Sequence, residues 1–228
     1  MKLNKQGCDM QSCFLCKLSL KEWLPAVEAH RKAHLYKKGE VIINEGDEVK
    51  GIYFVTDGVV KVHKKWGDKE LIVRFAKKGD IFGHRGLGKD SIYPISATAL
   101  ESVTVCFIEL SFFKQSLRVN FDFIQELLMF YSRELQESEK NMRNLAHMPV
   151  KGRLAQALLL LEEKFGTSET GCINITLSRQ DLASYVGTTY ETVFRVMGDL
   201  VQENLIEIVG KDVRITHYED LKKLTIEA

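Results

Sequence analysis

Residues 177–197 read LSRQDLASYVGTTYETVFRVM, and their pattern indicates how the C-terminal part of the chain folds. Ser178 and Thr188 each offer a side-chain oxygen that is followed three residues later by a carboxylate, a signature of a helix start. Gly187 permits a tight turn, and the small Ala183 lets the second helix approach the first. Four apolar residues occupy the positions that close the core between the helices: Leu182, Val186, Val193 and Val196. The pattern predicts a helix-turn-helix.

The segments on either side complete a small domain. We expect a helix over residues 150–164 and a strand over residues 173–177. Two further strands, over residues 205–209 and 213–216, flank the turn Gly210-Lys211-Asp212, which predicts a hairpin. A helix-turn-helix followed by a hairpin is a winged helix-turn-helix.

The second helix of the pair, over residues 189–200, is expected to enter the major groove of DNA. Glu191 and Arg195 are four residues apart and therefore project from the same side. Arg195 can donate two hydrogen bonds to guanine and Glu191 can accept one from cytosine, each contact discriminating by roughly 1–3 kcal/mol. The alternative is an exposed ion pair between these two side chains, worth about 0.3–0.5 kcal/mol. The other residues expected at the DNA, several of them at phosphates, are Arg179, Gln180, Thr188, Thr189, Tyr190 and Thr192.

Net charge gives no support for nucleic-acid binding. The formal charge is +1, and residues 149–228 contain nine Lys or Arg against twelve Asp or Glu. DNA-binding domains are usually basic, because neutralising phosphates drives affinity. The DNA-binding prediction therefore depends on the placement of a few residues. The rival hypothesis is a regulatory signalling module whose C-terminal domain binds protein rather than DNA.

From about Leu18 to Glu109 the sequence reads as short strands separated by glycine turns. The spacing from Gly46 to Gly58, and again from Gly67 to Gly79, is twelve residues. Evenly spaced short strands favour an antiparallel β-roll of the double-stranded, jelly-roll-like kind. Strands are expected over residues 41–43, 51–55, 59–62 and 71–75.

Between residues 121 and 145 the apolar residues recur in alternating steps of four and three, with Ser138 in the one polar slot. This heptad spacing is typical of a helix that pairs with a second helix, so we expect a dimerisation helix. Polar residues between the seam positions, such as Glu134 and Glu137, are expected on a solvated face. The alternative is an amphipathic helix that only covers the β-roll. The seam residues are Ile124, Leu128, Tyr131, Leu135, Met142 and Leu145.

The expected fold class is α+β, with a hinge at Met148-Pro149, because proline disfavours helix at the residue before it. The expected parts are a cysteine-containing segment (1–18), a sensor β-roll (19–115), the dimerisation helix (116–148) and the winged helix-turn-helix (149–228). No run of about 18 apolar residues suggests a membrane span, and residues 1–8 do not resemble a secretory signal. We therefore expect a cytoplasmic protein with reduced thiols. Without a nucleophile–base pair or a phosphate-binding loop, we expect no enzyme.

The run 177–197 resembles the recognition motif of Crp–Fnr transcription regulators. The glycine-paced strands, the long helix and residues 203–206 (ENLI) before the wing extend the resemblance over nearly the whole chain. It implies a cyclic-nucleotide-type β-roll and a homodimer that binds double-stranded DNA, with RNA polymerase as a further partner. It also implies that Glu191 and Arg195 read a half-site containing TGA, two of which form a palindrome. Phe194 stands where the oxygen-responsive branch has serine, which leaves the outer base of the half-site open.

The resemblance bears on the signal that the β-roll senses. Members that bind a cyclic nucleotide have glutamate just after a glycine and arginine-serine some ten residues later. Here His84 follows Gly83, and Pro94-Ile95-Ser96 occupies the later stretch, so we do not expect a cyclic nucleotide.

A [4Fe–4S] cluster and haem are the alternative cofactors. Cys8, Cys13 and Cys16 form a C-x4-C-x2-C motif, and Cys106 lies in a segment similar to the strand with the fourth cluster cysteine in oxygen-sensing relatives. The motif departs from the usual C-x2-C-x5-C spacing. Cys106 can equally be a small core residue, with an unidentified small ligand as the signal. Haem, with nitric oxide or carbon monoxide as the signal, is a further alternative, and its possible ligands are His30, His34, His63 and His84.

Overall fold

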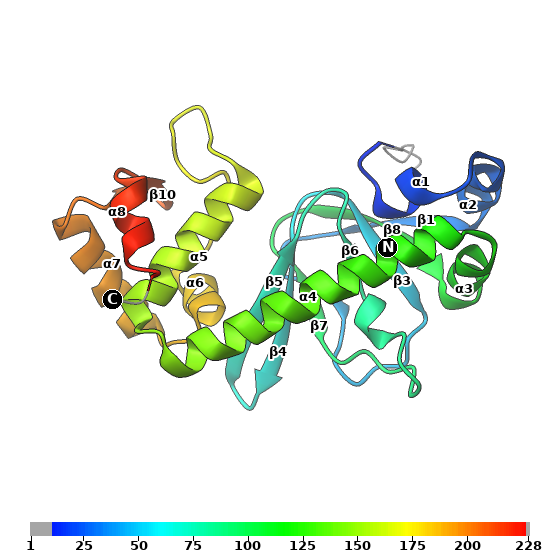
Figure 1. Ribbon diagram of the computed structural model, residues 1–228, viewed down its shortest axis with the longest axis horizontal. Coiled ribbons are helices and arrows are strands. Elements are labelled where there is room, and N and C mark those ends of the chain that lie inside the picture. The colour runs from blue at the N-terminus through cyan, green and yellow to red at the C-terminus, as the bar shows by residue number, and fades with distance from the viewer. Residues whose placement is uncertain (1–10, 227–228) are drawn as a thin grey trace. The chain divides into compact units, whose positions relative to one another are not determined.

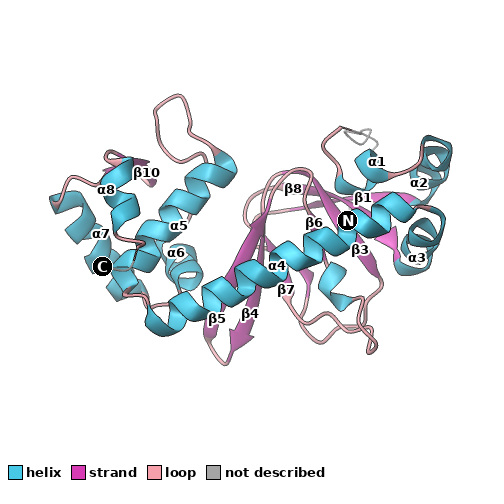
Figure 2. Ribbon diagram, viewed as in Figure 1, coloured by secondary structure: helices cyan, strands magenta, loops and turns pink. Residues whose placement is uncertain are grey.

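The structure, a computed structural model, describes residues 11–226 (Figures 1 and 2). Its internal contacts divide the chain into two compact units, the first ending at Leu135 and the second beginning at Gln136. The division falls inside the long helix α4 (Phe121–His147). The domain bounds expected from the sequence stay a prediction.

Two four-stranded antiparallel sheets form the first unit and confirm the predicted β-roll. The first sheet has the order β1-β8-β3-β6, with β1 (Arg31–Tyr36), β8 (Val103–Glu109), β3 (Gly51–Asp57) and β6 (Ile81–Phe82). The second has the order β2-β7-β4-β5, with β2 (Val41–Ile43), β7 (Ser96–Ala99), β4 (Val60–Trp66) and β5 (Lys69–Ala76). Side chains from both sheets share one buried cluster, among them Val105 of the first and Val62 of the second.

The glycines whose spacing predicted turns between the strands do lie in turns with positive φ. The values lie between 57° and 92° for Gly46, Gly58, Gly67 and Gly79. At Gly58 a side chain would also be excluded, because an added Cβ would lie 2.5 Å from the carbonyl oxygen of Ser102. The strand lengths therefore follow from where the chain can reverse.

A helical segment precedes the roll and corrects the expectation of strands from about Leu18. It consists of α1 (Phe14–Leu18), a 3-10 turn η1 (Lys21–Trp23) and α2 (Leu24–His30). Leu15 and Val27 bury their side chains in a second core cluster beside the first sheet. Helices of five and seven residues are too short to show a 3.6-residue period, which explains why the sequence did not reveal them.

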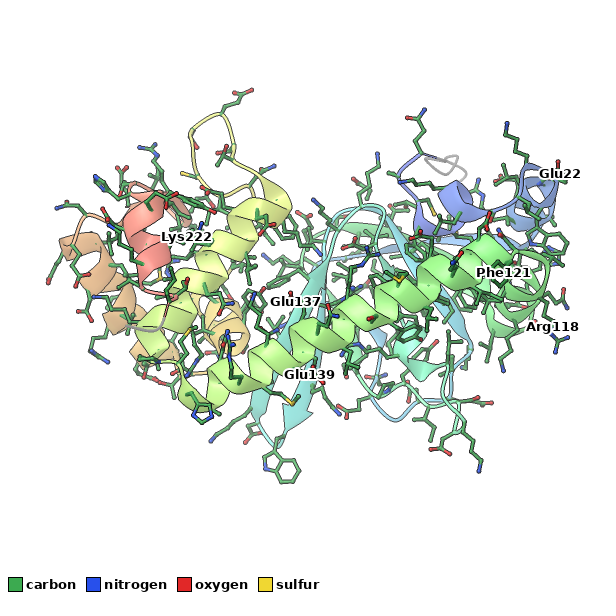
Figure 3. All side chains as sticks on the ribbon, in the orientation of Figure 1. Glu22, Arg118, Phe121, Glu137, Glu139 and Lys222 are labelled. Atoms are coloured by element: carbon green, nitrogen blue, oxygen red, sulfur yellow. The ribbon has the colours of Figure 1, made fainter. Side chains whose placement is uncertain are left out.

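The long helix α4 follows α3 (Leu110–Val119) and carries two apolar stripes. Phe123 and Leu127 are buried against the roll, together with the half-buried Phe130. A second stripe is exposed and contains five of the six predicted seam residues, at 38–66% exposure: Ile124, Leu128, Leu135, Met142 and Leu145. The sixth, Tyr131, packs against the roll cluster, and its hydroxyl donates to the carbonyl oxygen of His84. Figure 3 marks Phe121, which is 73% exposed, at the first residue of α4.

The second unit contains the predicted winged helix-turn-helix. Its elements are α5 (Val150–Phe165), α6 (Arg179–Val186), α7 (Tyr190–Gln202), the hairpin of β9 (Ile206–Val209) and β10 (Asp212–Ile215), and α8 (Tyr218–Lys223). The strand predicted over residues 173–177 is wrong. Ile173 forms a single bridge with Thr167, and no strand among residues 11–226 pairs along the segment. The alternation of apolar residues in this segment instead reflects the burial of Ile173 and Leu177 in the domain core.

Within residues 11–226, no helix has the length and apolarity needed to cross a membrane.

Candidate DNA interface and sensor region

The helix pair is built as the sequence indicates, with one correction at its second cap. Ser178 caps α6, because its hydroxyl oxygen accepts a hydrogen bond from the Asp181 amide at 3.0 Å. The cap of α7 is Thr189, not the predicted Thr188, and its hydroxyl accepts from the Thr192 amide at 3.3 Å. Thr188 belongs to the preceding turn, where its amide donates to the carbonyl oxygen of Ala183. Gly187 between them has the left-handed conformation, with φ of 72°.

One face of α7 is buried and the other is exposed. The buried residues are Val193, Val196, Met197 and Leu200, each at most 3% exposed. Glu191 and Arg195 lie on the exposed side, and the Arg195 side chain is 70% exposed. The ion pair considered between them is not the one that forms, since Arg195 Nη1 lies 3.6 Å from Asp199 Oδ2.

The Glu191 carboxylate lies at the start of α7. Hydrogen bonds from its own backbone N–H and from the Thr189 hydroxyl lower its pKa. It is therefore an ionised acceptor at neutral pH. Of the other residues expected at the DNA, Gln180, Thr189 and Tyr190 are exposed, and Arg179, Thr188 and Thr192 are half-buried.

The guanidinium of Arg153, in α5, holds the turn between α6 and α7. Its Nε donates to the carbonyl oxygen of Val186 at 3.0 Å, and Nη2 donates to that of Gly187 at 3.3 Å. Nη1 donates to the carbonyl oxygen of Met148 at 2.7 Å, directly before Pro149. One side chain therefore joins the end of α4 to the turn that precedes α7. Arg153 is not among the site residues expected from the sequence pattern.

A buried carboxylate links α4 to the roll, and this corrects the expectation that Glu134 lies on a solvated face. The Glu134 side chain is 12% exposed. Its Oε1 accepts from Arg74 Nη1 at 2.6 Å, and its Oε2 accepts from His84 Nε2 and Arg85 Nε, both at 3.0 Å. The guanidinium of Arg74 also lies over the Phe130 ring, 5.6 Å from its centroid. The sequence contains a pattern that could have indicated the burial of Glu134. Phe123, Leu127, Phe130 and Glu134 are spaced by alternating steps of four and three residues, as the seam residues are.

Protonation in this cluster follows from burial and charge. Burial alone would raise the pKa of Glu134, but the His84 hydrogen bond and the nearby guanidinium groups outweigh it and hold the pKa far below its usual range. Burial lowers the pKa of His84, which the Glu134 hydrogen bond only partly opposes. His84 is therefore neutral and donates from Nε2. Its buried Nδ1 has no hydrogen-bond partner within residues 11–226.

The predicted cluster cysteines converge in part. Cys13, Cys16 and Cys106 are buried in one core cluster of the first unit, which also contains Phe123 and Leu127 of α4. Cys8 lies outside the described residues. The described residues alone contain no group of three or more His, Cys, Asp or Glu that could hold a metal ion.

The four candidate haem ligands lie in separate environments. His84 binds Glu134, and His63 Nε2 lies 2.9 Å from the Thr98 hydroxyl within the second sheet. His34 is buried beside Phe107, while the exposed His30 stacks on Phe112 at 4.1 Å between ring centroids.

Comparison with known proteins supports the class that this architecture defines, a DNA-binding regulator with a β-roll sensor. The model of the cyclic nucleotide-binding domain matches residues 33–120, and that of the Crp-like helix-turn-helix domain matches residues 152–224. The cAMP-activated global transcriptional regulator CRP of Salmonella typhimurium is 31% identical over 191 residues, covering 81% of this chain and 90% of that protein. The CRP of Pasteurella multocida is 30% identical over 190 residues, with the same coverage.

Solved structures agree in fold. FixK2 from Bradyrhizobium japonicum superposes with a TM-score of 0.78 at 24% identity, covering 87% of this chain and 98% of that one. A CooA mutant from Carboxydothermus hydrogenoformans also gives 0.78, at 18% identity, covering 99% and 98%. The chain belongs to the Crp–Fnr family of DNA-binding transcription regulators, which are not enzymes.

Proposed function

We propose that the protein acts as a homodimer that reads a palindrome of TGA-type half-sites through Glu191 and Arg195. The observation that carries this proposal is the exposed face of α7. On this face the ionised carboxylate of Glu191 and the guanidinium of Arg195 lie one turn apart, while the opposite face is buried. A carboxylate and a guanidinium on neighbouring base pairs suit cytosine N4 and guanine O6 and N7. Arg179, Gln180, Thr188, Thr189, Tyr190 and Thr192 would contact phosphates or flanking bases. The protein would act in the cytoplasm, with RNA polymerase as a further partner.

The dimer proposal is supported by the exposed stripe of α4. Large side chains that remain 38–66% exposed at heptad spacing are expected to be covered by a second copy of the helix. The α7 helices of the two copies could then enter successive major grooves, about 34 Å apart.

The DNA-reading proposal is tested by fluorescence anisotropy on a duplex with two inverted TGA half-sites centred about 10 base pairs apart. Arg195→Ala should lose the preference for this duplex over random DNA while weak, salt-sensitive binding remains. Tyr218→Ala, an exposed residue of α8, is the control. Equal losses on both duplexes would argue against base reading by Arg195. A parent protein without salt-dependent binding to the palindrome would favour a protein-binding module.

The dimer is tested separately with Leu135→Asp, which places a charge in the exposed stripe. Sedimentation should show a monomer that no longer binds the palindrome. A variant that remains dimeric, or binds as tightly as the parent, would contradict the seam.

For the signal, we propose a group bound by Cys13, Cys16 and Cys106 together with Cys8, rather than a cyclic nucleotide. The burial of three thiols in the cluster that contains Phe123 and Leu127 supports this, because a change at the thiols would reach α4 directly. Thiolates are the ligands of a [4Fe–4S] cluster, which would supply an oxygen-sensitive group. A cyclic nucleotide is disfavoured because His84 and Arg85, after Gly83, are engaged by Glu134.

Anaerobic reconstitution with iron and sulfide tests the thiol proposal. We expect about four iron and four sulfide per chain, lost in air and absent in Cys106→Ala. Cys172→Ala, a buried cysteine of the second unit, should retain them. No bound iron in the parent would mean that Cys106 is a core residue and that the signal is a small ligand of the β-roll.

A further inference from the structure

The helix α7 carries an exposed pair of aromatic residues, and the proposed roles of Glu191 and Arg195 do not explain why it is there. Phe194 is 65% exposed and Tyr190 is 44% exposed. Their rings are stacked, with 6.4 Å between centroids and 17° between planes. The four apolar side chains that hold α7 in the domain lie on its opposite face. Phe194 therefore contributes nothing to that core.

The pair shares the face of the two proposed base-reading residues. At roughly 100° per residue, Tyr190, Phe194, Glu191 and Arg195 follow one another around α7 within an arc of roughly 140°. The order places Phe194 between Tyr190 and Glu191. If Glu191 and Arg195 reach base edges, Phe194 must lie at the base edges beside them.

Gly198 provides a second, independent observation on the same face. It is a helical glycine without positive φ, and an added Cβ would meet nothing within 4 Å. The described structure therefore gives no packing or backbone reason for glycine, although glycine weakens a helix relative to alanine. Gly198 falls between Phe194 and Glu191 around the helix and one turn after Phe194. A missing side chain at this place leaves room for a surface that approaches the helix closely.

We propose that Phe194, supported by Tyr190, contacts the C5-methyl group of a thymine within or next to the TGA element and thereby specifies that base pair. This inference rests on the proposed reading of DNA by Glu191 and Arg195. The thymine methyl is the apolar group displayed in the major groove, and an aromatic side chain is a suitable partner for it. The alternative role for the pair is a local stacking contact that slightly stabilises the helix.

Replacing thymine by deoxyuridine removes only the methyl group and tests the contact directly. The duplex carries two inverted TGA half-sites, and the flanking bases are first selected from a random library with the parent protein. Each thymine on either strand of one half-site is then replaced in turn. We expect one replacement to weaken binding of the parent about fourfold, the effect of losing one buried methyl group. Phe194→Ala should bind the thymine and deoxyuridine duplexes equally, while Phe194→Leu should retain part of the discrimination.

The controls separate this inference from the function on which it rests. Tyr218→Ala should discriminate as the parent does. If Arg195→Ala abolishes site preference but no replacement distinguishes the parent from Phe194→Ala, only the thymine contact is overturned. If the parent shows no preference for the palindrome, the base-reading function and the thymine contact both fail.

Discussion

The carboxylate of Glu134 in α4 lies 3.0 Å from the imidazole Nε2 of His84 in η2 (His84–Gly86), the short helix that follows β6. The two residues are 50 positions apart in the sequence. Together with the bond from the Tyr131 hydroxyl to the His84 carbonyl oxygen, this contact fastens the middle of α4 to the roll. The turn that follows β6 and the part of α4 around Tyr131 and Glu134 are therefore joined by side-chain hydrogen bonds.

Removing the Glu134 charge should destabilise the protein strongly. Glu134→Gln leaves Arg74 and Arg85 without their carboxylate, and breaking a buried ion pair costs roughly 3–5 kcal/mol. Urea denaturation should show this loss in the free energy of unfolding. Glu139→Gln, an exposed position of the same helix marked in Figure 3, should change it by less than about 0.5 kcal/mol. Similar small losses in both variants would contradict a buried network.

Stability should decrease as the pH falls below about 6.5, the ordinary pKa of histidine from which burial lowers that of His84. Because the folded-state pKa is the lower one, the unfolded chain binds the proton first, and protonation favours unfolding. Below about 4.5 the stabilisation from Glu134, whose pKa is also lowered, is lost in turn. Urea denaturation at pH 7.5 and pH 5.5 measures the first effect.

His84→Gln keeps a donor toward Glu134 but cannot be protonated in this range. Its loss of stability between the two pH values should be smaller than that of the parent. The pKa of the buried His34 is lowered as well, chiefly by burial, but His34 is present in both proteins and its contribution cancels. An identical pH dependence in the two proteins would assign the effect elsewhere.

Replacing Arg153 should loosen the turn that precedes α7, although Arg153 is not among the residues proposed to contact DNA. Arg153→Lys keeps the charge but cannot reach the carbonyl oxygens of Val186, Gly187 and Met148 together, because lysine lacks the planar fork. We expect a loss of about 2 kcal/mol in the stability of the second unit and weaker binding to the palindrome. Lys151→Ala removes an exposed ion pair with Glu203 in the same unit and should cost less than about 1 kcal/mol. Equal effects would mean that the turn does not depend on Arg153.

Gly198→Ala should change stability and DNA affinity in opposite directions. The free protein should gain roughly 0.5–1 kcal/mol, because alanine favours helix and the site is open. Palindrome binding should weaken by about tenfold, or about 1.4 kcal/mol, if DNA approaches the backbone there. Gly88→Ala, at an equally open site in the roll, should leave binding unchanged. Stabilisation without any loss of affinity would place Gly198 away from the DNA.

The sequence predicted the helix pair well because its signals are local. Gly187 lies between two helices whose first residues are capped, and the apolar residues of both helices have a fixed spacing. Together these local features leave residues 177–197 little freedom in how they fold. The two predictions that were wrong in this domain, the cap of α7 and the strand over residues 173–177, also have local causes. Thr188 and Thr189 are both plausible caps, and only the backbone path through the turn selects Thr189. Residues 173–177 alternate like a strand, but a strand exists only when a second segment pairs with it.

The sequence specified the helix pair of the second unit, the turns of the β-roll and the residues on each face of α7, but not the helices α1 and α2 that precede the roll. It also showed that α4 has heptad spacing. It could not decide which of two overlapping stripes of α4 packs on the roll, because a period states that a face is apolar and not what covers it. The tertiary structure assigned Phe123, Leu127 and Glu134 to the roll and left Leu128 and Leu135 exposed. A buried charge such as Glu134 is stable only where partners from distant segments converge, and that convergence exists only in the folded chain.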